Sequence, residues 1–121
     1  MPDAFPPGFA EGVRSFNTGA FFEAHEAFEA LLDEVEDDTR WDLLVALIQV
    51  AVGYHKVSAG HPGGARMLRL GAEKLVPFPA VAWTVRVDAL RQRVRADVGL
   101  LDAGETLADR LATSPPAIET I

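Results

Sequence analysis

Cysteine is absent from this chain of 121 residues. Its absence excludes a disulfide framework, a thiolate nucleophile and any zinc site built on cysteine ligands. A chain of this length can bury a single core without such cross-links, since folding should remove about two-thirds of the unfolded surface from water. We therefore expect one domain over residues 1–121. The lack of disulfide bonds agrees with a cytoplasmic protein.

Positive charge and long apolar runs are both scarce. Lysine and arginine total 11 against 18 acidic residues, so the net charge is -7. Non-specific binding to a phosphate backbone needs clustered basic residues, and we expect no nucleic-acid partner. The most apolar stretch, Leu43 to Tyr54, is shorter than the ~20 residues of a membrane helix. The first residues resemble no secretory signal, so we expect a soluble cytoplasmic protein without a membrane partner.

Apolar residues recur at helical spacing along most of the chain. This periodicity predicts an all-α, single-domain antiparallel bundle of about five helices. Prolines 77 and 79 predict an irregular link that covers one end of the core before the last helix. The expected segments are a short helix ending near Asn17, helices from Phe21 to Val35, from Arg40 or Trp41 to Ala59 and from Ala65 to Leu75, a C-terminal helix over about 88–102, and a tail over 104–121 that lies across the body.

The helix that starts at Arg40 or Trp41 is expected to be the central one. Its middle, residues 43–53, is apolar nearly all round, as in the most buried helix of a bundle. Asp38 or Thr39 is the expected N-cap, since both side chains can accept a hydrogen bond from a free backbone N–H. The helix from Phe21, apolar on one side only, should pack against it.

The stretch from Phe21 to Glu29 combines aromatic rings with a histidine and three carboxylates. His25 lies at the edge of the apolar stripe, with Glu29 beside it one turn later. Gln49 and His55 follow on the central helix. We expect a polar cluster between the two helices, in which His25, Glu29 and Gln49 can close a hydrogen-bond network. Its expected members are Glu23, His25, Glu29, Gln49 and His55.

A divalent metal site is the sharpest enzymatic alternative at this cluster. His25 and Glu29 at i, i+4 present an imidazole and a carboxylate on adjacent turns, and His55 on the facing helix could add a third ligand. Glu26 would then be the general base for a metal-bound water, as in His-Glu-x-x-His proteases. Glu29 replaces the second histidine of that motif. The pattern admits zinc, manganese or iron and does not choose among them.

A second alternative is an anion site at residues 61–69. Gly63 and Gly64 open a helix whose first backbone N–H groups could hold a phosphate, with Arg66 and Arg69 on the next turns. Under this hypothesis the protein binds an anion or a phosphorylated small molecule.

Two strings in the sequence resemble a known family. Phe21-Phe22-Glu23-x-His25-Glu26-x-Phe28-Glu29 is followed at a suitable distance by Leu47-Ile48-Gln49-Val50-Ala51, then by His55 and Gly64-Ala65-x-x-Leu68. This order resembles the domain of unknown function family 309, over about residues 10–75. The resemblance implies a small all-helical bundle found in prokaryotes and plastids, with no established activity. It places the motif residues on the same two helices as the polar cluster.

The leading functional expectation is a small binding or scaffold protein without enzymatic activity, whose partner is a protein or a small molecule. Self-association into a homodimer is also expected, because a bundle this short leaves apolar residues such as Phe22 outside the main stripe.

Overall fold

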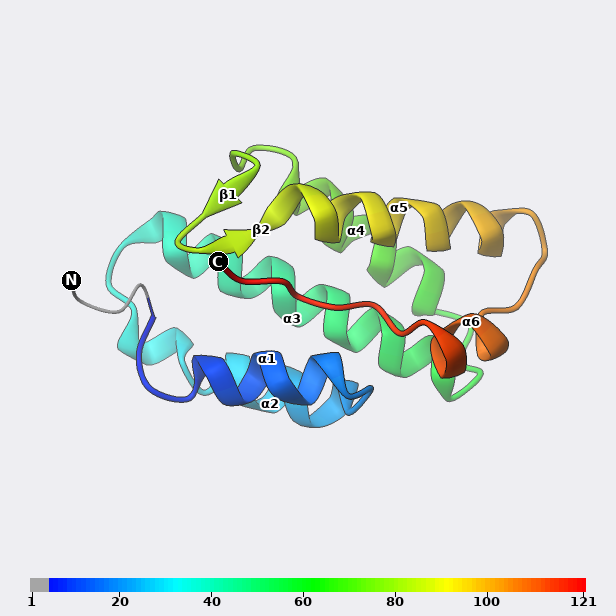
Figure 1. Ribbon diagram of the computed structural model, residues 1–121, viewed down its shortest axis with the longest axis horizontal. Helices are drawn as coiled ribbons and strands as arrows, with labels where there is room; N and C mark the ends of the chain where they lie inside the picture. Colours follow the sequence, from blue (N-terminus) through cyan, green and yellow to red (C-terminus); the bar gives the residue numbers. More distant parts are fainter. Residues whose placement is uncertain (1–4) are drawn as a thin grey trace.

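The computed structural model describes residues 5–121 and shows a mostly helical single domain (Figure 1). The prediction of an all-α bundle is confirmed, with five helices of nine residues or more and one short helix near the C-terminus. A two-stranded hairpin is the addition that periodicity did not predict. The elements are α1 (Phe9–Asn17), α2 (Phe21–Glu29), the 3-10 helix η1 (Leu32–Glu34), α3 (Asp38–Ser58), α4 (Gly64–Leu75), β1 (Val81–Ala82), β2 (Val85–Arg86), α5 (Val87–Asp102) and α6 (Ala108–Thr113).

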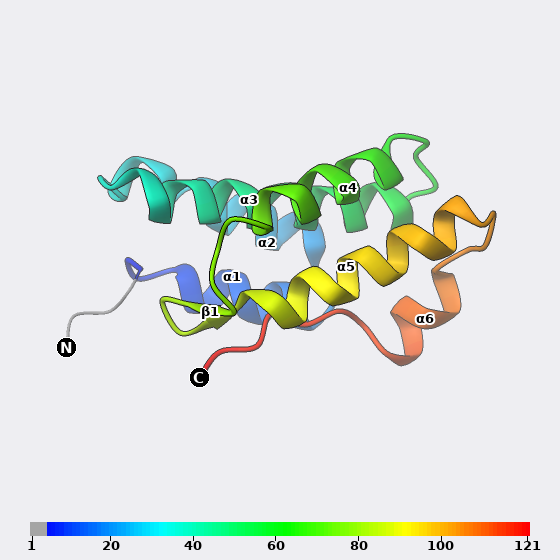
Figure 2. The same ribbon diagram turned by 90° about the horizontal axis from the view of Figure 1, so that it is seen from above.

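The helices form two layers, with the core between them (Figure 2). One layer holds α2, α3 and α4, and the other holds α1 and α5. Each helix packs against its neighbour in the chain, in the order α1, α2, α3, α4, α5. Short connections between successive helices produce this antiparallel order. No helix within residues 5–121 is long and apolar enough to cross a lipid bilayer.

Helix α3 is central, as the sequence predicts, and it contacts both α2 and α4. Its buried side carries Leu43, Leu47 and Tyr54, all fully inaccessible to solvent. The N-cap is Asp37 and not the expected Asp38 or Thr39, because the Asp37 carboxylate accepts a hydrogen bond from the Arg40 backbone N–H at 3.0 Å. That bond and the Arg40 guanidinium lower the pKa of Asp37 to about 2.

Glycines allow α4 to lie directly on α3. A Cβ at Gly53 would lie 2.7 Å from the Leu68 side chain, and one at Gly71 would lie 2.7 Å from the Val50 side chain. Gly64 meets Val57 in the same way, at 2.6 Å. No real Cβ fits at such distances, so the glycines set the spacing between these two helices.

Helix α2 ends earlier than predicted, at Glu29 instead of Val35. The chain continues as a turn and the 3-10 helix η1, while Leu31 and Val35 stay buried. No basic residue lies in the last turn of α2, and acidic residues follow it. A run of carboxylates at a helix C-terminus opposes the helix dipole, which explains why the helix stops.

The segment after α4 forms the hairpin β1–β2, in which Val81 pairs with Arg86 and Ala82 with Val85. Trp83 and Thr84 form its turn with φ values of 46° and 69°. Val85 and Ala82 are buried and Phe78 and Trp83 pack on the core, so the link covers one end of the core as predicted.

The C-terminal tail lies across the body, also as predicted, and runs between α1 and α5 in Figure 1. Asn17 binds the backbone of Ile118 twice, donating to its carbonyl at 3.1 Å and accepting from its N–H at 2.7 Å. Thr120 forms an antiparallel bridge with Val85. Leu107 and Ile118 are buried, so the tail contributes to the core.

Candidate functional site

The predicted pair of His25 and Glu29 is present on the surface of α2. His25 Nε2 lies 3.2 Å from Glu29 Oε2, and His25 Nδ1 lies 3.1 Å from the Phe22 carbonyl oxygen. Both ring nitrogens thus face acceptor oxygens, and only the protonated imidazole can donate to both. The Glu29 side chain is 62% exposed, so this is a surface ion pair and worth little to stability.

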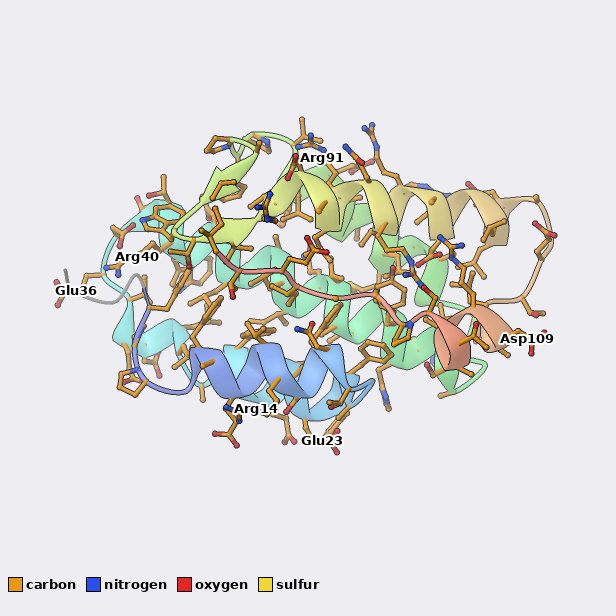
Figure 3. All side chains as sticks on the ribbon, viewed as in Figure 1. Arg14, Glu23, Glu36, Arg40, Arg91 and Asp109 are labelled. Atoms are coloured by element: carbon orange, nitrogen blue, oxygen red, sulfur yellow. The ribbon has the colours of Figure 1, made fainter. Side chains whose placement is uncertain are left out.

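The other predicted members of the polar cluster do not join this pair. Gln49 is half-buried, and its Oε1 is buried without a hydrogen-bond partner among residues 5–121. His55 is exposed and contacts the Phe22 ring, at 5.3 Å between ring centroids. Glu23 points into solvent (Figure 3). The expected closed network of His25, Glu29 and Gln49 is therefore wrong as geometry, because only the first two are bonded.

Of the ligands that the metal hypothesis requires, the structure brings only His25 and Glu29 next to each other. The Phe22 ring packs against both imidazoles, 5.2 Å from His25 and 5.3 Å from His55. Within the described part of the chain, no three His, Asp or Glu side chains group closely enough to hold a metal. Glu26 is exposed and lines a shallow depression with His25 and Glu29.

The start of α4 satisfies its own backbone groups. The Gly63 N–H donates to His61 Nδ1 at 3.1 Å, and the Gly64 N–H donates to the His61 carbonyl at 3.3 Å. Arg69 donates to both carboxylate oxygens of Asp102 on α5, at 2.7 and 2.9 Å. Arg66 is exposed at this end, and the half-buried Lys56 brings its ammonium near Gly63. The geometry therefore does not support the anion site predicted at residues 61–69.

A buried ionic cluster that the sequence reasoning missed lies between α3, α5 and α6. Asp97 is fully buried and accepts hydrogen bonds from Tyr54 Oη at 2.5 Å, Arg93 Nε at 2.8 Å and Arg110 Nε at 2.6 Å. Burial, with the Asp97 carboxylate as the next cause, raises the pKa of the Tyr54 hydroxyl far above its ordinary value. Arg93 also donates to the Ser114 carbonyl at 2.6 Å. The cluster therefore fastens α6 and the tail to the body.

One signal could have revealed this cluster. Asp97 follows Leu90 by seven residues and Val94 by three, so it lies on the apolar stripe of α5. A lone acid on such a stripe requires partners.

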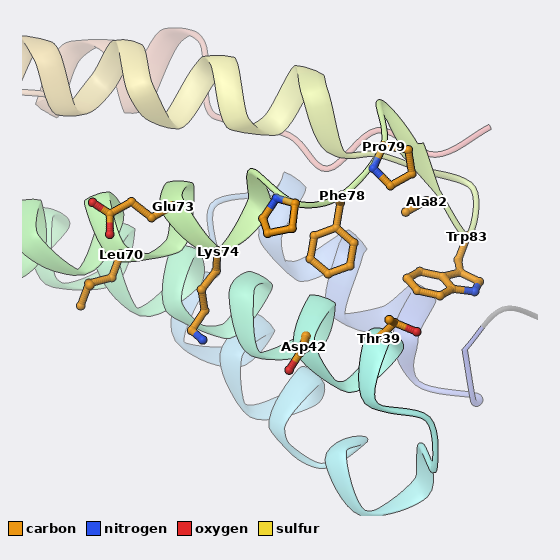
Figure 4. A pocket seen from close by; sticks show the side chains of 10 residues that line it. Thr39, Asp42, Leu70, Glu73, Lys74, Phe78, Pro79, Ala82 and Trp83 are labelled. Atoms are coloured by element: carbon orange, nitrogen blue, oxygen red, sulfur yellow. The ribbon is translucent and has the colours of Figure 1, made fainter.

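A groove of about 880 Å³ lies between the first half of α3, the end of α4 and the link that follows (Figure 4). Its walls are mainly apolar and include Phe78 and Trp83, whose rings meet edge to face at 6.3 Å. Thr39 and Asp42 lie opposite these rings in Figure 4. The residues that line it are Thr39, Asp42, Leu70, Glu73, Lys74, Pro77, Phe78, Pro79, Ala82 and Trp83.

The Thr39 hydroxyl of this groove donates to Asp37 Oδ2 at 3.0 Å, whereas two charged side chains of the groove are not committed elsewhere. Asp42 and Lys74 make no hydrogen bond or ion pair with any residue in 5–121, unlike Arg69 or Asp97. Trp83 adopts its φ of 46° at the mouth of the same groove, a conformation uncommon for a bulky residue. Strained backbone of this kind gathers at ligand-binding sites. The groove is thus the best-formed candidate site.

Comparison with known proteins agrees with the sequence resemblance. Residues 9–68, about half of the chain, match the model of the family described as "Domain of unknown function (DUF309)". The matched segment covers α1 to the first turns of α4, and so includes the His25–Glu29 pair and part of the groove. No curated protein matches the chain. On this match the chain belongs to the DUF309 family.

Proposed function

We propose that the protein is a binding protein without enzymatic activity, and that its ligand occupies the groove between α3, α4 and the β1–β2 link. The observation that carries the proposal is the composition of the groove: apolar and aromatic walls with a few uncommitted polar groups. Small-molecule sites have this composition, in which apolar walls supply affinity and a few polar groups fix the orientation of the ligand.

The lining residues favour a flat apolar ligand that carries at least one polar group. Phe78 and Trp83 offer an edge and a face to an aromatic ring. Lys74 offers a cation for an acidic substituent, and Asp42 accepts hydrogen bonds from an N–H or O–H group. A highly charged ligand does not fit, because Asp42 and Glu73 oppose the charge of Lys74 within one groove.

The polar cluster on α2 supports this function less well. Its one ion pair, His25 with Glu29, is open to solvent, and Glu26 is exposed beside it. Neither the metal hypothesis nor the anion hypothesis is favoured by an observation of comparable weight.

Binding of 8-anilinonaphthalene-1-sulfonate tests the proposal, because this probe is a flat apolar ring system with one acidic group. We expect saturable binding by the folded chain, followed by probe fluorescence. Trp83→Gly should weaken binding about tenfold, which corresponds to about 1.4 kcal/mol. Glycine is chosen because it adopts positive φ readily, so the turn survives while the indole is lost.

Trp41→Ala is the matched control, since Trp41 is exposed on α3 and does not line the groove. Unchanged affinity in Trp83→Gly, or a loss in Trp41→Ala alone, would place the probe elsewhere and overturn the proposal.

A further inference from the structure

The side of α3 that faces away from the core is apolar but uncovered. Trp41, Val45 and Val52 recur at i, i+4 and i+11 on the side opposite Leu47. Trp41 is 42% exposed, and the two valines are half-buried. A helix that is apolar all round belongs in the interior of a protein. Among residues 5–121, the core, α2 and α4 cover the other sides of α3, while this side stays open to solvent at Trp41.

The neighbouring helices extend this apolar surface. Phe22 of α2 is 43% exposed and Leu70 of α4 is 37% exposed, while Met67 of α4 is half-buried. These residues belong to the two helices that flank α3 in the α2–α3–α4 layer (Figure 2), and their exposure places them on the side of that layer away from the core. We call this surface the outer face; its apolar members are Phe22, Trp41, Val45, Val52, Met67 and Leu70. Contiguous apolar surface of this kind marks an interaction site.

Charge is distributed unequally across the outer face. The α2 edge carries the exposed carboxylates of Glu26 and Glu29, whereas the α4 edge carries the exposed cations Arg66 and Lys74. Glu73 lies seven residues after Arg66 on the same side of α4 and also lines the groove with Lys74. The two cations outnumber this carboxylate, so the α2 edge is acidic and the α4 edge is more basic, with the apolar surface of α3 between them.

The charged residues Glu29 and Lys74, one on each edge, lie at similar positions along the axis of α3. Phe22 lies beside His55, and Glu29 is two turns further along α2, roughly 10 Å toward the start of α3. Gly71 lies against Val50, and Lys74 is about 4.5 Å further in the same direction. Glu29 and Lys74 therefore lie within about one turn of the same level.

We propose that the outer face is the interface of a homodimer whose two-fold axis runs along α3. Such an axis places α2 of one copy over α4 of the other at the same height, so the acidic edge of each copy meets the basic edge of its partner. Glu29 then faces the partner's Lys74, and the α3 helices pack side by side. A surface with acidic and basic edges at matching heights is self-complementary, which an isologous dimer requires.

The size of the outer face suits a stable dimer. Helix α3 has 21 residues and is about 30 Å long, and three helices at 8–10 Å spacing make a face about 25 Å wide. The product is on the order of 750 Å² for each copy, close to the roughly 800 Å² that each partner buries in a standard interface.

Sedimentation equilibrium of the full chain at submillimolar concentration tests the proposal. We expect a dimer, and a monomer of unchanged far-UV circular dichroism in Val45→Glu, which places a charge at the centre of the face. Glu29→Lys and Lys74→Glu should each weaken the dimer at least about tenfold. The double variant Glu29→Lys with Lys74→Glu should restore dimerisation, because each reversed charge meets its reversed partner.

Glu23→Lys is the matched control, since Glu23 is an exposed carboxylate of α2 that borders a depression with Glu11 of α1 and, unlike Glu29, does not line the depression beside His25. A monomeric wild-type chain would overturn the proposal and assign the outer face to a different protein partner. A dimer that survives Val45→Glu, or a double variant that stays monomeric, would contradict this interface or this axis. Trp83 lies outside the outer face, whereas Leu70 and Lys74 belong to both the outer face and the groove. Dimerisation is therefore also measured in Trp83→Gly, which should lose groove binding and still dimerise.

Discussion

Replacing Asp97 with alanine should be the most destabilising single change of a polar residue that the structure predicts. The substitution removes the acceptor of three hydrogen bonds, from Tyr54, Arg93 and Arg110. Tyr54 is fully buried and the Arg93 side chain is 17% exposed, so neither can readily regain its bond from water. The Arg110 side chain is 40% exposed and can turn to solvent.

The expected loss of stability follows from this difference in exposure among the three partners of Asp97. Breaking a buried ion pair by removing one partner costs about 3–5 kcal/mol. Since Arg110 can be rehydrated, we expect the lower end of that range, about 3 kcal/mol. A domain of this size has a total stability of roughly 6–18 kcal/mol, so the variant should fold but melt well below the wild type.

Urea denaturation followed by far-UV circular dichroism measures this loss. Asp102→Ala is the matched control, because Asp102 is also a carboxylate of α5 paired with an arginine, yet its side chain is 55% exposed. The control should change the free energy of unfolding by no more than about 1 kcal/mol. A loss below about 1 kcal/mol in Asp97→Ala, or equal losses in the two variants, would refute the view that the buried cluster fastens α6 to the body.

Two further predictions concern pH and helix packing. The pKa of the Tyr54 hydroxyl is raised in the folded state, so as the pH rises the unfolded chain loses the hydroxyl proton before the folded chain does. The contribution of Tyr54 to stability should be full below about pH 10, and the free energy of unfolding should fall above it by about 1.4 kcal/mol per pH unit. Tyr54→Phe should abolish this pH dependence, as measured by urea denaturation at alkaline pH. Gly53→Ala should destabilise by about 1–3 kcal/mol, because the new Cβ meets the Leu68 backbone nitrogen at 2.9 Å. Gly99→Ala, which meets nothing within 4 Å, should stabilise α5 by up to about 1 kcal/mol. Thermal melts that rank the two alanine variants in the opposite order would contradict the assigned packing.

Much of the fold could be predicted from periodicity. The apolar stripes of α1, α3, α4 and α5 follow the helical repeat, and the order and length of these helices agree with the prediction. The ends of helices were less predictable, because an N-cap depends on which of three neighbouring acceptor side chains reaches a free N–H. Asp37 takes that place through its bond to Arg40, although the side chains of Asp38 and Thr39 can also accept such a bond.

The candidate site could be predicted only in part. The i, i+4 spacing of His25 and Glu29 correctly predicts their contact, since it depends on one helix alone. His55 does lie on the α2 side of α3, but only Phe22 in the first turn of α2 reaches it. Arg93 turns inward from α5 to bond the buried Asp97, a contact that the sequence analysis did not predict. The groove combines residues from α3, α4 and the 77–83 link. A sequence pattern within one of these segments does not predict that the three lie together.

The proposed binding site is tested most directly by the two indole N–H signals of the full chain in a two-dimensional ¹H–¹⁵N spectrum. The chain contains two tryptophans, Trp41 and Trp83, and the Trp83→Gly variant assigns the signals by loss of one. During titration with 8-anilinonaphthalene-1-sulfonate, the Trp83 indole signal should shift progressively to saturation while the Trp41 signal stays in place. A shift of the Trp41 signal alone, or no shift of either, would contradict the proposal that the groove binds the ligand.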